Sequence, residues 1–162
     1  MEQLSILDSP DSTPESICTQ VARIFGVRTT EIALLRLDGK LLKFVYPPEL
    51  QNVGAIPLSS SAVAAVTARK RRPDLFNTFT RVKHSSVFEV VKLGENGADA
   101  EVIQKLMSVP LVAESGEVVG VIQVSRKAYT PAATGPDFTP EDLHKLETVA
   151  VSVARVMGTT KP

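Results

Sequence analysis

The chain has 162 residues, 43% of them hydrophobic, which is enough for one core and too little for two large independent domains. Lys and Arg together number 18, as do Asp and Glu, so the net charge is zero and a general nucleic-acid binder is disfavoured. The single cysteine, Cys18, excludes an internal disulfide and a cysteine-based zinc site, and His84 and His144 are the two histidines. We therefore expect no metal site.

No stretch approaches the roughly 18 consecutive apolar residues of a membrane span. The first residues are acidic and lack the basic start and apolar run of a leader peptide. We therefore expect a cytoplasmic protein with no membrane segment. Residues 1–12 are interpreted as a flexible lead-in, residues 13–158 as one domain and residues 159–162 as a tail.

The first predicted element is a short amphipathic helix. It begins at residues 12–15, which combine a hydroxyl cap, a proline suited to the first turn and an acid near the positive helix end. Ile17, Val21 and Ile24 then recur at helical spacing, and Gly26 supplies a stop.

An antiparallel hairpin and a buried helix are predicted next. The strands span 31–37 and 40–46, because Asp38-Gly39 between them tolerates the φ angles of a tight turn. After Pro47-Pro48, three serines at 59–61 cap an alanine- and valine-rich helix that runs to Ala68. The basic run 69–72 closes this helix, where cations meet its negative carbonyl end.

The second half of the domain begins with its weakest pattern, at residues 77–105. We expect a loop or a short helix here, and a segment of this length in a compact domain is usually functional or mobile. A second hairpin is predicted from 106–113 and 118–125, whose apolar residues are mostly β-branched, around the turn 114–116. A cap with a proline in its first turn, at 138–142, then starts the last helix.

The last helix is apolar on more than one face. One set of apolar residues follows the a/d spacing of about two heptads, and a second set, Val149, Val151, Ala154 and Val156, widens the stripe. Such a helix can pack on its own sheet and on a second subunit, so a homodimer built from the terminal helices is predicted. Its predicted interface residues are Ile17, Val21, Ile24, Leu143, Leu146, Ala150, Val153 and Met157.

Several segments together resemble a known family. Residues 56–61 read IPLSSS, 106–111 read LMSVPL, 119–124 read VGVIQV and 138–143 read FTPEDL. In the order helix, hairpin, helix, variable segment, hairpin and long helix, they resemble the GAF domain over roughly residues 13–158.

The resemblance implies an α+β fold with a central antiparallel sheet of about five or six strands. Terminal helices would cover one face, and a pocket would lie on the other. Members of the family bind cyclic nucleotides, bilins, haem, amino acids or oxoacids, or bind nothing and join subunits. Function must therefore be argued from the site itself.

The residues match some of these activities only in part. The motif of the cyclic-nucleotide members corresponds to Arg126-Lys127, Phe138 and Asp142-Leu143. Arg126 and Leu143 stand where the motif has Asn and Glu. The alternative interpretation is that these residues form a salt bridge or a helix cap. Cys18 lies far from the pocket that holds bilin, and thiol exchange by reductase members needs more than one cysteine. We expect Cys18 to be a small core or interface residue.

The histidines and the basic run have two interpretations each. His84 lies where some members present an axial haem ligand, although a solvated or hydrogen-bonding histidine is the simpler interpretation, and His144 is expected to be exposed on its helix. The run 69–72, with Arg81 and Lys83, is either an anion site or a solvated helix end. No catalytic constellation is present, so we expect neither an enzyme nor a cofactor.

Strand geometry and the variable segment supply the candidate ligand-binding residues. For each apolar candidate, the alternative is that it packs in the core and contacts no ligand. Tyr46, Ser108 and Gln123 are the stronger candidates, because a buried polar group needs a hydrogen-bond partner. Phe44 and Tyr46, two positions apart on one predicted strand, are expected to lie on the same face of the sheet. The candidates are Phe44, Tyr46, Phe76, Phe79, His84, Phe88, Ser108, Gln123 and Ser125.

Two functions follow as hypotheses. The first is a sensory module that binds a small molecule beneath residues 76–105 and acts through its terminal helices, with a separate protein as a possible output. The second is a dimerisation or docking module without a ligand.

Overall fold

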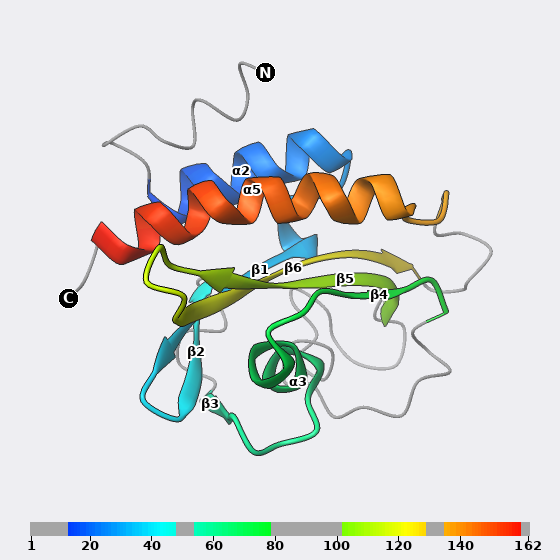
Figure 1. Ribbon diagram of the computed structural model, residues 1–162. Coiled ribbons are helices and arrows are strands. Elements are labelled where there is room, and N and C mark those ends of the chain that lie inside the picture. Colours follow the sequence, from blue (N-terminus) through cyan, green and yellow to red (C-terminus); the bar gives the residue numbers. More distant parts are fainter. Residues whose placement is uncertain (1–12, 48–53, 79–101, 129–134, 160–162) are drawn as a thin grey trace.

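The computed structural model describes residues 13–47, 54–78, 102–128 and 135–159. Within these ranges, six strands form one antiparallel sheet in the order β3-β2-β1-β6-β5-β4. Helices α2 and α5 lie side by side on one face, and α3 lies on the other (Figure 1). The predicted α+β architecture is therefore confirmed.

The elements differ from the predicted ones mainly at the sheet edges. Strands β3 and β4 have three residues each, too few to show a period of two in the sequence, and β5 begins inside the segment predicted to be a loop. The elements are α2 Pro14–Phe25, η1 Thr29–Glu31, β1 Ile32–Asp38, β2 Leu41–Tyr46, β3 Ala55–Pro57, α3 Val63–Lys70, β4 Asp74–Phe76, β5 Val102–Val112, β6 Val118–Ala128 and α5 Pro140–Thr159.

Local signals place the ends of α2 as expected, whereas the predicted serine cap of α3 is wrong, because its N-cap is Ala62, which makes no side-chain cap hydrogen bond, and the helix runs past Ala68 to Lys70. The Thr13 side chain accepts a hydrogen bond from the Ser16 backbone N–H, while Ser16 Oγ accepts one from the Thr13 N–H, so a capping box begins α2. Gly26 ends the helix at a φ of 65°, in the left-handed region that favours glycine. No helix within the described ranges is both long enough and apolar enough to cross a membrane.

One main core lies between the sheet and the α2/α5 layer. Side chains from both helices meet the faces of β1, β5 and β6 there, and the largest buried ones include Phe138 and Ile17. Burial of an apolar side chain of this size stabilises the fold by about 1.5–3 kcal/mol. The two terminal helices are therefore held by the sheet of their own chain.

The opposite face carries a second core beneath α3. It contains the alanines of α3 together with Leu35, Phe44, Leu106 and Val121 from four strands. With eight residues, α3 is about 12 Å long, whereas the 11-residue strands β5 and β6 extend about 36 Å. Among the described helices, α3 alone covers this face, and it covers only part of the strand length (Figure 1).

The predicted placement of Phe44 and Tyr46 on one face is wrong, because β2 contains a bulge. Leu34 pairs with Tyr46 and Leu35 with Phe44, so Val45 is an extra residue in β2. An extra residue reverses the alternation of side chains. Phe44 accordingly packs in the core beneath α3, and Tyr46 packs in the core beneath α2 and α5.

Candidate functional site on the α3 face

A buried row of polar side chains joins α3 to the centre of the sheet. Ser108 on β5 and Gln123 on β6 are cross-strand neighbours, and the Gln123 Nε2 donates to Ser108 Oγ at 3.1 Å. The hydroxyl oxygens of Ser108 and Thr67 lie 2.8 Å apart. All three residues are at most 2% exposed.

The hydrogen bonds of this row run in one direction. A carboxylate only accepts, so the Thr67 hydroxyl donates to Asp74 Oδ2 at 2.9 Å. Thr67 then accepts from the Ser108 hydroxyl, which in turn accepts from Gln123. Each hydroxyl both donates and accepts, as buried polar groups require.

Ser108 and Gln123 therefore contribute to holding α3 against the sheet. Sequence reasoning singled out these two residues but missed their partners, Thr67 and Asp74. Thr67 stands as a polar residue inside an otherwise alanine-rich, buried helix, and that was the available signal. Its pairing with Ser108, 41 residues away, depends on how α3 crosses the sheet.

The remaining candidate ligand residues do not lie together. Ser125 is fully buried on β6, and its hydroxyl donates to the Glu31 backbone carbonyl at 3.1 Å. Phe76 is partly buried against the core beneath α3, the same core that holds Phe44. Tyr46 lies on the other face. The candidates Phe79, His84 and Phe88 lie outside the described residues.

The positions that match the cyclic-nucleotide motif make structural contacts. Lys127 donates from Nζ to the Thr30 carbonyl at 3.1 Å and from its backbone N–H to Glu31 Oε2 at 2.6 Å. Asp142 caps α5, since its Oδ2 accepts from the Thr139 N–H at 2.8 Å. These contacts agree with the interpretation of the residues as a tie and a cap, while cyclic-nucleotide binding stays a hypothesis.

Most cations of the basic run at the end of α3 already bind hydrogen-bond acceptors of this chain. Arg69 binds the carbonyls of Leu58 and Ser60, Lys70 lies 2.7 Å from Asp74, and Arg71 binds the Gly116 carbonyl. These contacts favour a tied helix end over an anion site. Arg81 and Lys83, the other cations considered for that site, lie outside the described residues.

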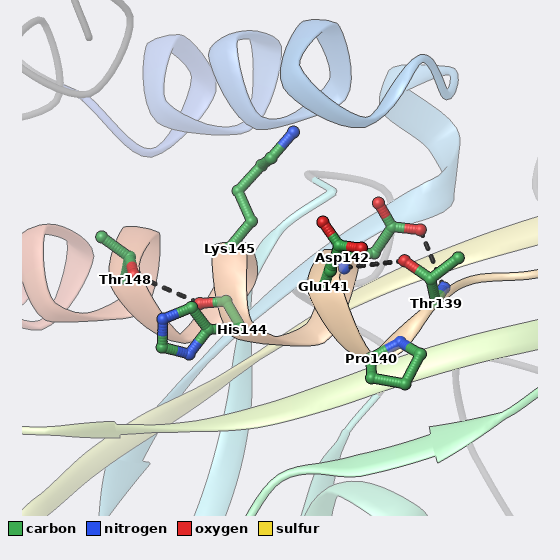
Figure 2. Close-up of a pocket in the computed structure, with 7 residues that line it drawn as sticks. All are labelled: Thr139, Pro140, Glu141, Asp142, His144, Lys145 and Thr148. Carbon is green, nitrogen blue, oxygen red and sulfur yellow. Dashed lines mark hydrogen bonds between the residues drawn. The ribbon is translucent and has the colours of Figure 1, made fainter.

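A hollow of about 640 Å³ lies beside the first turns of α5 (Figure 2). Two backbone donors at this helix end are already used, because Asp142 Oδ2 accepts from the Thr139 N–H and Thr139 Oγ1 accepts from the Asp142 N–H at 3.0 Å. His144 is exposed there, as expected, and Lys145 extends toward α2, with its Nζ 5.9 Å from the centre of the Phe25 ring. The hollow is lined by Thr139, Pro140, Glu141, Asp142, His144, Lys145 and Thr148.

The side chains predicted to join two subunits lie in the core of this chain. Ile24 and Leu143 pack against it partly buried, and the other six are at most 4% exposed: Ile17, Val21, Leu146, Ala150, Val153 and Met157. The outward face of α5 instead exposes mainly polar residues around Val151, which is 57% exposed. The homodimer itself stays a prediction.

Cys18 is completely buried in the core, in agreement with one of the two places expected for it. Burial raises the pKa of its thiol well above the usual range, because the core disfavours the charged thiolate. Among the described residues, no group of three or more His, Cys, Asp or Glu side chains is placed to hold a metal ion.

Comparison with known proteins identifies the family. The family model of the GAF domain matches residues 8–157, so the chain belongs to the GAF domain family, whose members are generally sensory or regulatory. No curated protein matches the chain in sequence.

Solved GAF structures share the fold at low sequence identity. The GAF domain from an Acinetobacter phosphoenolpyruvate-protein phosphotransferase is 14% identical with a TM-score of 0.70, over 98% of this chain and 92% of that chain. The A. aeolicus nlh2 GAF domain in an inactive state is 17% identical with a TM-score of 0.64, over 99% and 93%. The reduced form of fRMsr of Staphylococcus aureus, an enzyme, is 14% identical with a TM-score of 0.62, over 96% and 90%.

Proposed function

We propose that this GAF domain is a non-enzymatic sensory module that binds a small molecule on the α3 face of its sheet. The observation that carries the proposal is that the described helices cover the two faces of the sheet unevenly. A 12-residue and a 20-residue helix lie on one face, whereas the eight-residue α3 is the described helix on the other. A pocket on the less covered face is also the arrangement that the family resemblance implies.

A buried acceptor near the start of β5 supports the same proposal. Gln104 is 3% exposed and lies at a bulge, where its Nε2 donates to the Ala128 carbonyl at 3.0 Å. Its Oε1 is buried and has no hydrogen-bond partner among the residues that the structure describes. An unpaired buried acceptor costs about 1–3 kcal/mol, and an N–H or O–H group of a bound molecule would remove that cost.

The non-enzymatic part of the proposal rests on Cys18. Thiol exchange requires an attacking and a resolving thiol, and this chain has one cysteine, buried and with a raised pKa. The GAF fold alone does not decide the matter, since one neighbour of this fold is an enzyme.

The experiment is a thermal-shift screen with cyclic nucleotides, amino acids and oxoacids, together with native mass spectrometry of the protein as isolated. A ligand that binds the folded state raises the melting temperature. Gln104→Leu should weaken binding of the hit, and Gln20→Leu, on α2 across the sheet, should leave it unchanged. No shift with any compound, and an isolated mass equal to the bare chain, would refute ligand binding.

The alternative proposal is a ligand-free dimerisation or docking module that passes its signal to a separate protein. The exposed Val151 on α5 favours it, because it is the most exposed of the large apolar side chains in the described ranges. Sedimentation at rising protein concentration tests it: a dimer weakened by Val151→Glu supports the proposal, and a monomer at micromolar concentration contradicts it.

A further inference from the structure

Strand β4 is bonded to helix α3 at its first residue. There, Asp74 accepts from Thr67 at 2.9 Å and from Lys70 at 2.7 Å, and both donors belong to α3. The Asp74 side chain is 14% exposed, so water competes little for these contacts. Strand β4 is therefore fastened to α3 on the less covered face.

One residue past β4, Asn77 is bonded to the segment that leads into α5. The Asn77 side chain donates from Nδ2 to the Phe138 carbonyl at 2.9 Å and accepts at Oδ1 from the Phe138 N–H at 2.8 Å. The amide thus pairs with both backbone groups of one residue, 61 positions away. Phe138 is 2% exposed and immediately precedes Thr139, which begins the cap of α5.

Neighbouring charged groups hold the same segment. Lys105 is 8% exposed, and its Nζ lies 2.5 Å from Asp137 Oδ1 and 3.4 Å from the Asn77 carbonyl. The Arg126 guanidinium lies over the Phe138 ring, 4.7 Å from its centre. A shift of Asn77 would therefore also move Phe138, which is buried and in contact with several neighbouring groups.

We propose that β4 transmits displacements of α3 to the first turn of α5, with Asp74 receiving them and Asn77 passing them on through Phe138. An extended backbone cannot stretch, so a movement at one end of this three-residue strand reaches the other end almost undiminished. Through this link, a molecule bound on the α3 face would affect the terminal helices, and this consequence rests on the proposed function. The mechanical coupling itself exists without a ligand.

Hydrogen exchange measured by mass spectrometry on the ligand-free chain tests the coupling. Thr67→Val removes the hydroxyl that binds Asp74 and keeps the branched shape of the side chain. We expect exchange in the first turn of α5 to become about tenfold faster relative to β6, whose central amides open only with global unfolding. In an Asn77→Ala background, the same substitution should add less than about twofold, because coupled sites are not additive.

The matched control is Ala64→Gly on the same helix. It weakens α3 by about 1 kcal/mol through backbone propensity and by the loss of one buried methyl group, and it removes no hydrogen bond to β4. It should speed exchange in α3 and leave the first turn of α5 unchanged. If Asn77→Ala does not fold, Asn77→Asp replaces it, since aspartate still accepts from the Phe138 N–H but cannot donate to its carbonyl.

Three results would overturn the proposal. They are an unchanged α5 in Thr67→Val, an equal rise in Ala64→Gly, and a full rise that persists in the Asn77 background. Because no ligand is added, a negative ligand screen would leave this result untouched, so the two proposals can fail separately.

Discussion

Gly120 is the position where one added methyl group should have the largest effect. It lies in the middle of the sheet, opposite Arg36 of β1 and Leu111 of β5. A Cβ atom there would overlap the backbone carbonyl oxygen of Leu35 and would lie 3.2 Å from Leu111 Cδ1. The overlapped atom belongs to the backbone of a paired strand, so it cannot turn aside as a flexible side chain could.

The magnitude follows from what must move. Relief of the overlap requires β1 to separate from β6, which weakens several ladder hydrogen bonds worth about 1 kcal/mol each and opens the packing on both faces. We expect Gly120→Ala to lower the free energy of unfolding by about 3 kcal/mol or more. Intrinsic propensity acts in the opposite direction, since alanine is favoured over glycine inside a strand by about 0.5–1 kcal/mol.

Urea denaturation followed by circular dichroism measures this effect. With a slope of about 2 kcal/mol/M, a loss of 3 kcal/mol moves the midpoint down by about 1.5 M. The control is Gly39→Ala, where no atom lies within 4 Å of the new Cβ and the cost is that of a φ of 64°. A value for Gly120→Ala within about 1 kcal/mol of the wild type would refute this account of the β1–β6 approach.

Three further expectations concern single side chains. Ser108→Ala should lower the free energy of unfolding in urea by about 1–3 kcal/mol, because it leaves a buried Gln123 donor unpaired. Adding Gln123→Leu to the same chain should recover part of this loss. A Ser108→Ala stability equal to that of the wild type would contradict the role of the polar row. The hydrogen bond from Lys43 lowers the pKa of Asp38 most, and the positive charge of Lys43 lowers it further. The pair therefore stabilises the fold above the unfolded pKa of Asp38, and this stabilisation is lost as the pH falls through the folded pKa. An NMR titration should show the Asp38 midpoint rising in Lys43→Ala, and an unchanged midpoint would refute the assignment. Cys18 should react with a thiol reagent only as fast as the chain unfolds, and stoichiometric labelling of the native protein would be inconsistent with its burial.

Much of the fold was predictable because its signals are local. The Thr13 cap, the Gly26 stop and the Asp38-Gly39 turn each act within a few residues, so the helix and hairpin they delimit appear where the sequence places them. The burial of the last helix could also be predicted in outline. Most of its apolar residues are core residues of this chain, because the sheet and α2 contact the stripe that was predicted to face a second subunit.

The candidate site was only partly predictable. Ser108 and Gln123 stood out as polar residues in apolar strands, and the structure pairs them with each other. Their continuation to Thr67, on a different element, could not be seen, because nothing local to either strand specifies which helix face lies above it. The bulge at Val45 likewise placed Phe44 and Tyr46 on opposite faces against the simple alternation.

The sequence by itself determined the class of fold, the ends of α2, the turns and the family, since each depends on spacing and on residues that act over one or two turns of chain. Tertiary structure alone decided that Asn77 pairs with Phe138 across 61 residues and that α3 rests on a polar row. These contacts form only after the sheet has brought distant segments together. The closure of such long loops leaves no periodic trace in the sequence.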